Sequence, residues 1–231
     1  MANFPIFGTT MKKQVLFIIA LLLSFAAIAQ QPLTFKKKGY TLIVTNNDPK
    51  LDLKEQVRLI TTFFQTYPKL AKAYNKSTAD TVYLIVDTAY TGVAATGHAR
   101  IRLSSNWIIT HPEDVDVVTH EGMHIVQNYG RSIGPGWLTE GIADYARYQF
   151  GVNNQTAKWA LPDIKTGQSY ANGYRITARF LAWIEKNVKK GTVKALDAQL
   201  RDHSYTTGSW EAISGKTLDE LWKDYAANPI I

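Results

Sequence analysis

The sequence is organised around the stretch Val117-Val118-Thr119-His120-Glu121-Gly122-Met123-His124-Ile125-Val126-Gln127. On a helix, the two histidines of its His-Glu-x-x-His pattern lie one turn apart on the same face, so both imidazole rings can reach one metal ion. Glu121 projects beside them, where it could accept a proton from a water molecule that attacks a substrate. The stretch therefore predicts a helix that carries His120 and His124 as metal ligands.

The residues before this stretch predict where the helix begins. Thr110-His111-Pro112-Glu113 has the pattern of a capping box with proline in the first turn. Acidic residues follow it and favour the positive end of a helix dipole. We expect the metal-binding helix to begin at this box.

A third ligand is expected from Trp137-Leu138-Thr139-Glu140-Gly141-Ile142-Ala143-Asp144-Tyr145, which begins thirteen residues after His124. A catalytic zinc site needs three protein ligands and an open position, and Glu140 is placed to complete the set. Asp144, one turn further on, could bond the distal N–H of a ligand histidine. A buried helix whose histidines bond only to backbone or solvent is the alternative. The acidic residues Glu140 and Asp144 in the later segment favour the metal site.

Several segments resemble a known family. Thr119–Gln127 and Gly136–Tyr145 resemble the plant basic secretory protein family and its bacterial relatives, as do Thr177–Leu181 and Gly215–Tyr225 near the C-terminus. That family consists of gluzincin-type zinc peptidases, so the resemblance implies a zincin-like fold, a Zn²⁺ cofactor and a peptide or polypeptide substrate. The Glu140-x-x-x-Asp144 spacing is similar to that of thermolysin-like enzymes. The metzincin continuation is absent, because Gln127 and Gly130 stand where its glycine and third histidine would be.

The first 29 residues are typical of a signal peptide. Met11-Lys12-Lys13 is a positive start, residues 15–28 are mostly apolar, and Ala27-Ile28-Ala29 is a small-x-small cleavage site. Residues 1–10 would lie upstream of the natural start. We expect cleavage after Ala29, a secreted or periplasmic protein without a membrane span in the mature chain, and one peptidase domain over residues 30–231.

Composition limits the classes of function. The chain has 231 residues, no cysteine and a formal net charge of +7. Without cysteines, an exported protein depends on its core and its metal for stability, and thiolate chemistry is excluded. Its basic residues form only short runs, so we expect no nucleic-acid partner, and we expect a monomer.

The first half of the chain predicts strands around one helix. Residues 34–45 and 81–86 are expected as strands, and residues 53–74 as a helix that Pro68 ends or bends. Residues 92–97 are expected as a loop of small residues. The alternating segment 99–103 is expected as an edge strand above the metal that pairs with extended substrate, with Arg100, Ile101 and Arg102 as substrate contacts.

The second half predicts helices only, at residues 173–187, 193–200 and 217–225. Tyr174 is the expected donor to the oxyanion of a tetrahedral intermediate, because it begins a helix that could face the cleft. An ordinary packing role for Tyr174 is the alternative, with Tyr170 and His203 as the next candidate donors.

Strands followed by helices indicate an α+β fold, with a mixed sheet beside the His-Glu-x-x-His helix and a mainly helical C-terminal part. The sequence therefore predicts an exported zinc metallopeptidase with Glu121 as general base. Two alternatives remain open: a catalytically silent binding protein with the zincin fold, and a hydrolase of cell-wall peptides or other amides.

Overall fold

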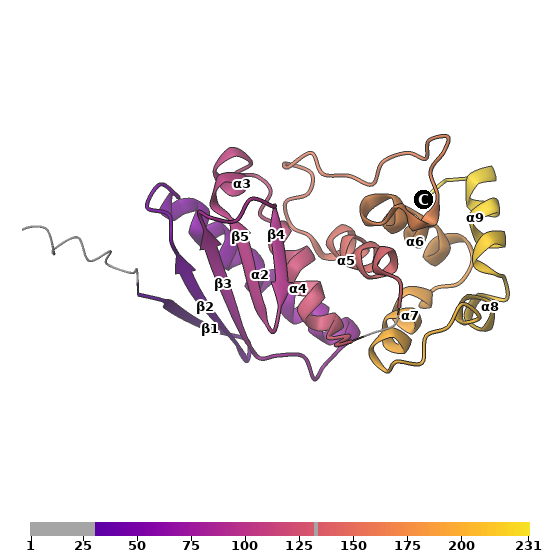
Figure 1. Ribbon diagram of the computed structural model, residues 1–231, viewed down its shortest axis with the longest axis horizontal. Coiled ribbons are helices and arrows are strands. Elements are labelled where there is room, and N and C mark those ends of the chain that lie inside the picture. Colours follow the sequence, from indigo (N-terminus) through magenta and orange to yellow (C-terminus); the bar gives the residue numbers. More distant parts are fainter. Residues whose placement is uncertain (1–30, 132–133) are drawn as a thin grey trace, which may run out of the picture. The chain divides into compact units, whose positions relative to one another are not determined.

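The computed structural model describes residues 31–131 and 134–231, so the expected signal peptide lies outside the described residues. Pro32–Ile231 form one compact unit. In Figure 1 the strands lie at the left with helix α2 behind them and α4 beside β4, and the later helices lie at the right. The α+β class with a mixed sheet and a helical C-terminal part is confirmed.

The sheet begins with a hairpin of β1 (Leu33–Lys37) and β2 (Tyr40–Asn46). The expectation of one strand over residues 34–45 is wrong, because Lys38 and Gly39 both have positive φ and reverse the chain. Two positive φ values are what a tight two-residue hairpin turn requires.

The sheet has the order β1-β2-β3-β5-β4. Strand β3 (Thr81–Asp87) pairs in parallel with β2 on one side and with β5 (Arg100–Ser104) on the other. Strand β4 (Ala94–Gly97) pairs antiparallel with β5. The expected loop of small residues therefore contains the edge strand β4. A second two-residue turn, His98-Ala99, joins β4 to β5, again with positive φ at both residues.

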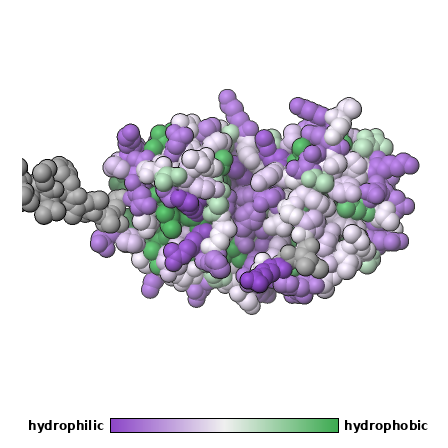
Figure 2. Space-filling model, in the orientation of Figure 1, coloured by the Kyte–Doolittle hydropathy of each residue, from purple (hydrophilic) through white to green (hydrophobic). Residues whose placement is uncertain are grey.

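The expectation that residues 99–103 form the edge strand is wrong, because β5 pairs with β3 on one side and with β4 on the other. Its sequence alternates because one face of the sheet is buried and the other is exposed. Ile101 is buried, whereas Arg100 and Arg102 lie on the exposed face. Figure 2 shows this outer face, where hydrophilic and hydrophobic residues lie side by side over the strands.

Helix α2 (Leu53–Tyr74) covers the other face of the sheet and has the bounds expected for it. Of the two expected effects of Pro68, an end of the helix is not found, because the helix continues through Pro68. Asp52 caps the first turn by accepting a hydrogen bond from the backbone N–H of Lys54 (2.8 Å). Phe63 and Tyr67 of α2 are buried between the sheet and α4. Apolar burial at these positions outweighs the loss of one helical hydrogen bond at Pro68.

The helix that carries His120 and His124 begins later than expected. Residues 105–110 form a separate short helix α3 (Ser105–Thr110), and α4 spans Val117–Gln127. The expected capping box is therefore wrong, and Asp116 stands at the N-cap instead. Its buried carboxylate accepts from the Thr119 hydroxyl (2.8 Å) and the Val152 backbone N–H (3.0 Å), which ties the start of α4 to the loop after α5.

The C-terminal part contains α5 (Gly136–Phe150), the 3-10 helix η1 (Tyr170–Asn172), α6 (Tyr174–Asn187), α7 (Thr192–Arg201), α8 (Ser209–Ser214) and α9 (Leu218–Ala227). Thr217 and Glu220 form a capping box at the start of α9. Helices α5 and α6 pack closely because residue 141 is glycine, and a β-carbon there would overlap the side chain of Thr177. No helix among residues 31–131 and 134–231 is long and apolar enough to cross a membrane.

Candidate metal centre

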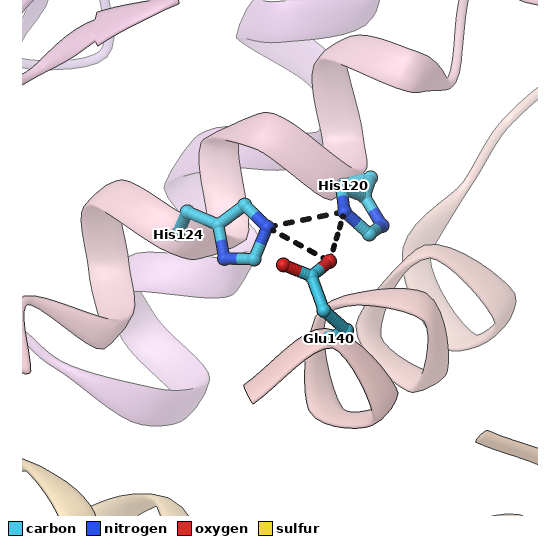
Figure 3. A group of neighbouring side chains, drawn as sticks. All are labelled: His120, His124 and Glu140. Atoms are coloured by element: carbon cyan, nitrogen blue, oxygen red, sulfur yellow. Dashed lines mark hydrogen bonds and ion pairs between the residues drawn. The ribbon is translucent and has the colours of Figure 1, made fainter. Parts of the chain in front are cut away.

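Helices α4 and α5 bring three potential ligand atoms together (Figure 3). The Nε2 atoms of His120 and His124 lie 3.1 Å apart. The Oε2 atom of Glu140 lies 3.2 Å from Nε2 of His120 and 3.5 Å from Nε2 of His124. The helical spacing of the histidines and the first turn of α5 thus produce the grouping that the sequence predicts.

The distal nitrogen of His120 is held by Asp144. Its Nδ1 atom lies 2.7 Å from Oδ1 of Asp144, and the Asp144 side chain is buried. Since a carboxylate only accepts hydrogen bonds, Nδ1 carries the proton and Nε2 of the neutral ring presents a lone pair. The structure therefore places Asp144 where the sequence expected it.

His124 has an equivalent partner that sequence reasoning missed. Its Nδ1 atom lies 2.7 Å from Oε1 of Gln127, whose amide nitrogen donates to the backbone oxygen of Thr139 (2.9 Å). That second bond fixes the orientation of the amide, so Gln127 presents its oxygen to the histidine. The available signal was its position three residues after His124 on the same helix face.

The three ligand atoms fit a divalent cation. In a tetrahedral zinc site with bonds of about 2.0–2.1 Å, ligand atoms lie about 3.3 Å from one another, close to the separations found here. With both Nδ1 atoms protonated, two lone pairs and a carboxylate oxygen converge, and such an arrangement is stable only around a positive charge. Two nitrogens and one oxygen are donors that zinc accepts.

The electrostatics of the unliganded group agree with this preference for a cation. Burial lowers the pKa of His120, but its hydrogen bonds to Asp144 and Glu140 outweigh burial and raise the pKa to about 10. Burial would raise the pKa of Glu140, whereas the two histidines lower it to about 2. The group therefore retains positive charge next to its carboxylates, in the form of a proton when no metal is present.

Glu121 lies next to the three ligands and is almost buried, with 5% of its surface exposed. Its Oε2 atom accepts a hydrogen bond of 2.6 Å from the hydroxyl of Thr96 on β4. The same hydroxyl lies 3.2 Å from the backbone oxygen of Glu121. Sequence reasoning missed Thr96, because it occurs in a segment of small residues that was expected to be a loop.

The ligand group lies in a cleft of about 1460 Å³. Its walls come from β4, from α4 and from α5, and the loop around Trp159 forms one end. Figure 2 shows hydrophilic surface between the strands and the C-terminal helices. The cleft continues past the ligands toward both ends of α4, since Asp114 lines one end and Tyr129 the other.

Tyr174 lines this cleft and is 58% exposed, so the alternative of an ordinary packing residue is wrong. Its ring lies 6.3 Å from that of His120 and is nearly parallel to it. The negative charge of Glu140 raises the pKa of Tyr174, which keeps its hydroxyl protonated. Tyr170 instead donates to Asp219 (2.9 Å), and neither Tyr170 nor His203 is among the described residues that line the cleft.

The three expected substrate contacts on β5 have other partners. Arg100 lies over the ring of Tyr83 at 4.5 Å, and Arg102 pairs with Asp87 at 2.5 Å. Ile101 is 1% exposed and belongs to the core. These side chains stabilise the sheet, and the structure does not bring them to the group of His120, His124 and Glu140.

The strand that borders the cleft is β4. The backbone N–H of Ser104 donates to the oxygen of Val93, which makes these two residues a hydrogen-bonded pair next to the ladder of β4 and β5. Because hydrogen-bonded and non-hydrogen-bonded pairs alternate in antiparallel strands, the backbone groups of Ala94 and Thr96 point away from β5. The Tyr90 hydroxyl caps the outward oxygen of Ala94 at 3.0 Å. Thr96 thus presents its backbone at the free edge.

Solved structures similar to this chain are zinc metallopeptidases. An M1 zinc metallopeptidase from Deinococcus radiodurans bound to a Tyr-Ser-Ala substrate matches with 13% sequence identity and a TM-score of 0.49, over 87% of this chain and 52% of that chain. A second structure of the M1 zinc metallopeptidase from the same organism matches with 11% identity and a TM-score of 0.48, over the same shares of the two chains. This chain therefore spans about half the length of the structures it matches.

A comparison with curated proteins finds no match. Residues 23–225 match the model of the family described as peptidase of plants and bacteria, which covers most of the chain. This match confirms the resemblance that the segments around His120 and Glu140 indicated. The chain belongs to the family of peptidases of plants and bacteria.

Proposed function

We propose that this protein is an exported zinc-dependent metallopeptidase with a zincin-like fold. The observation that carries the proposal is the convergence of His120, His124 and Glu140, with both histidines fixed in the tautomer that presents Nε2. Zinc bound there would supply Lewis-acid activation of a water molecule and of the scissile carbonyl. A peptide substrate is supported by the peptidase family to which the chain belongs.

Glu121 acts as the general base in this proposal. Glu121 lines the cleft, and Thr96 occupies its Oε2 atom, which leaves Oε1 to accept the proton of the attacking water. Glu121 then passes that proton to the leaving amine. The burial of Glu121 protects its carboxylate from bulk water and strengthens its interactions.

Tyr174 is the proposed donor to the oxyanion. Its hydroxyl is protonated at neutral pH, and its ring lies beside that of His120 in the lining of the cleft. A neutral donor at this place stabilises the negative charge that develops on the carbonyl oxygen in the transition state.

The edge strand β4 is the proposed docking strand for extended substrate. Thr96 offers an outward N–H and C=O, which can exchange two hydrogen bonds with one residue of a peptide. Such pairing uses only the main chain and gives little sequence selectivity. The cleft passes the ligand group on both sides, which favours cleavage within a chain over removal of terminal residues.

The experiment measures zinc content and hydrolysis of unfolded casein for the purified chain from Gln30 onward. We expect about one zinc ion per chain, activity that a chelator abolishes and zinc restores, and loss of nearly all turnover in Glu121→Gln with zinc retained. Glu211→Gln on α8, away from the cleft, is the control and should retain wild-type activity. Zinc binding without any hydrolysis would favour the silent binding protein, and cleavage of cell-wall peptides but not casein would favour the third class.

Export is a separate part of the proposal and rests on the pattern of residues 1–29. Expression of the full chain in a bacterial host, followed by mass spectrometry of the mature protein, tests it. The expected N-terminus is Gln30, and an intact N-terminus in the cytoplasm would contradict it.

A further inference from the structure

The side chain and the backbone of Thr96 face different parts of the cleft. The backbone groups of Thr96 point to the free edge of the sheet, where we propose that substrate pairs. Its side chain points instead toward α4, where it reaches Glu121. One residue of the edge strand thus touches both the place of the substrate main chain and the proposed general base.

The hydrogen bond from Thr96 restricts the carboxylate of Glu121. The hydroxyl has one proton and two nearby acceptors, the Oε2 atom at 2.6 Å and the backbone oxygen at 3.2 Å. The shorter distance and the negative charge favour donation to Oε2. Because only 5% of the surface of Glu121 is exposed, water competes little for this bond.

We infer that Thr96 is the positioning residue for Glu121, and that it couples the docking of substrate on β4 to the orientation of the general base. This inference rests on the proposed function. By holding Oε2, Thr96 leaves Oε1 as the oxygen that takes the proton, in one fixed orientation relative to the ligand group. A peptide that pairs with Thr96 also holds the strand in place, and with it the hydroxyl that orients Glu121.

A purely structural role would have different consequences. If Thr96 only packed β4 against α4, its loss would lower the melting temperature and the zinc content, and would raise KM by disturbing the docking strand. A positioning role predicts a loss in kcat with these quantities retained, because the hydrogen bond matters only when the proton moves.

The test compares Thr96→Val, which keeps the shape and the β-branched side chain, with Thr96→Ser, which keeps the hydroxyl. Thr45→Val, on the outer face of β2, is the control for the same chemical change elsewhere in the sheet. For Thr96→Val we expect a decrease in kcat of about 10–100-fold, as for a lost hydrogen bond to a charged group, with KM and zinc content unchanged. Thr96→Ser should recover most of the wild-type kcat.

A second readout does not depend on activity. Crystal structures of the metal-free wild type and of metal-free Thr96→Val should show one orientation of the Glu121 carboxylate in the first and a changed or divided orientation in the second. An unchanged carboxylate in Thr96→Val, or a Thr96→Ser variant as impaired as Thr96→Val, would overturn the inference. Absence of hydrolysis in the wild type would refute the proposed function instead, and the crystal structures alone would then decide the role of Thr96.

Discussion

The Nδ1 atom of His124 lies 2.7 Å from Oε1 of Gln127, on the same helix and one turn away. His120 has a charged partner in the same role, Asp144 on the neighbouring helix. The two histidines are therefore fixed by different groups, one neutral and local, the other negative and from α5. Loss of either partner should weaken metal binding by leaving one histidine ring free to rotate.

Substitution of Glu140, Asp144 and Gln127 should lower zinc affinity by different factors. Glu140→Ala removes a ligand and should lower affinity severely, whereas Asp144→Ala and Gln127→Ala should each lower it by about 10–100-fold, because they only orient a ligand. Competition with a chromophoric chelator measures these constants. Wild-type affinity in Glu140→Ala would assign the third ligand elsewhere, and wild-type affinity in Gln127→Ala would show that His124 needs no partner.

Tyr174→Phe should reduce turnover by about 10²–10³-fold with zinc content and fold retained, because it removes only the hydroxyl that donates to the oxyanion. Tyr148→Phe, a tyrosine exposed on α5 away from the cleft, is the matched control. Steady-state kinetics on a fluorogenic peptide measures the effect. Turnover of Tyr174→Phe within a few-fold of the control would assign the oxyanion to another donor.

Tyr90→Phe should improve the binding of longer peptides. The hydroxyl of Tyr90 occupies the outward oxygen of Ala94, which a substrate backbone could otherwise use. Its removal frees one acceptor for the substrate. KM should therefore fall about 2–10-fold, the effect of one ordinary hydrogen bond, for peptides that extend past Thr96, and it should stay unchanged for short peptides. If KM changes equally for both lengths, β4 is not the docking strand.

Asp197 should make stability depend on pH. Burial raises the pKa of this carboxyl from 3.8 to about 6, although Arg201 (2.8 Å) and the Tyr129 hydroxyl (2.9 Å) act against burial. A raised pKa in the folded state means that the contribution to stability is full below about pH 4 and is lost as pH rises through about 6. In metal-free protein this loss is about 3 kcal/mol.

The measurement is the free energy of unfolding by urea between pH 4 and pH 7, with metal absent. Asp197→Asn should show a smaller decline over this range than the wild type, and Asp80→Asn, at an exposed aspartate that does not act on Asp197, should behave as the wild type. Parallel curves for Asp197→Asn and the wild type would show that Asp197 does not titrate in this range.

Sequence alone predicted the part of the site whose geometry is local. Helical spacing places His120 and His124 on one face, and it relates Asp144 to Glu140 in the same way, so these positions follow from the chain itself. Thr96 meets Glu121 only through the packing of β4 against α4, and no spacing in the sequence encodes that contact. Gln127 had a local signal, but its role depends on the bond from its amide to Thr139 on α5.

The fold also contains elements that the sequence predicts and elements that depend on contacts distant in sequence. The long amphipathic helices were predicted because their apolar faces repeat over several turns. The edge strand β4 was missed because alanine and glycine have little preference for strands, and its identity comes from pairing with β5. The His98-Ala99 turn contains no glycine or asparagine, so nothing in its sequence marked a hairpin.

The glycine that follows Glu140 has a consequence for motion within the cleft. With no side chain at Gly141, the side chain of Thr177 on α6 packs in the space that a β-carbon on α5 would occupy, so we expect sliding of one helix along the other to disturb this packing. Glu140 and Tyr174 thus lie on two closely packed helices, and we expect them to move together as substrate enters. We therefore expect any opening or closing of the cleft to occur at the opposite wall, where the short strand β4 lies at the edge of the sheet.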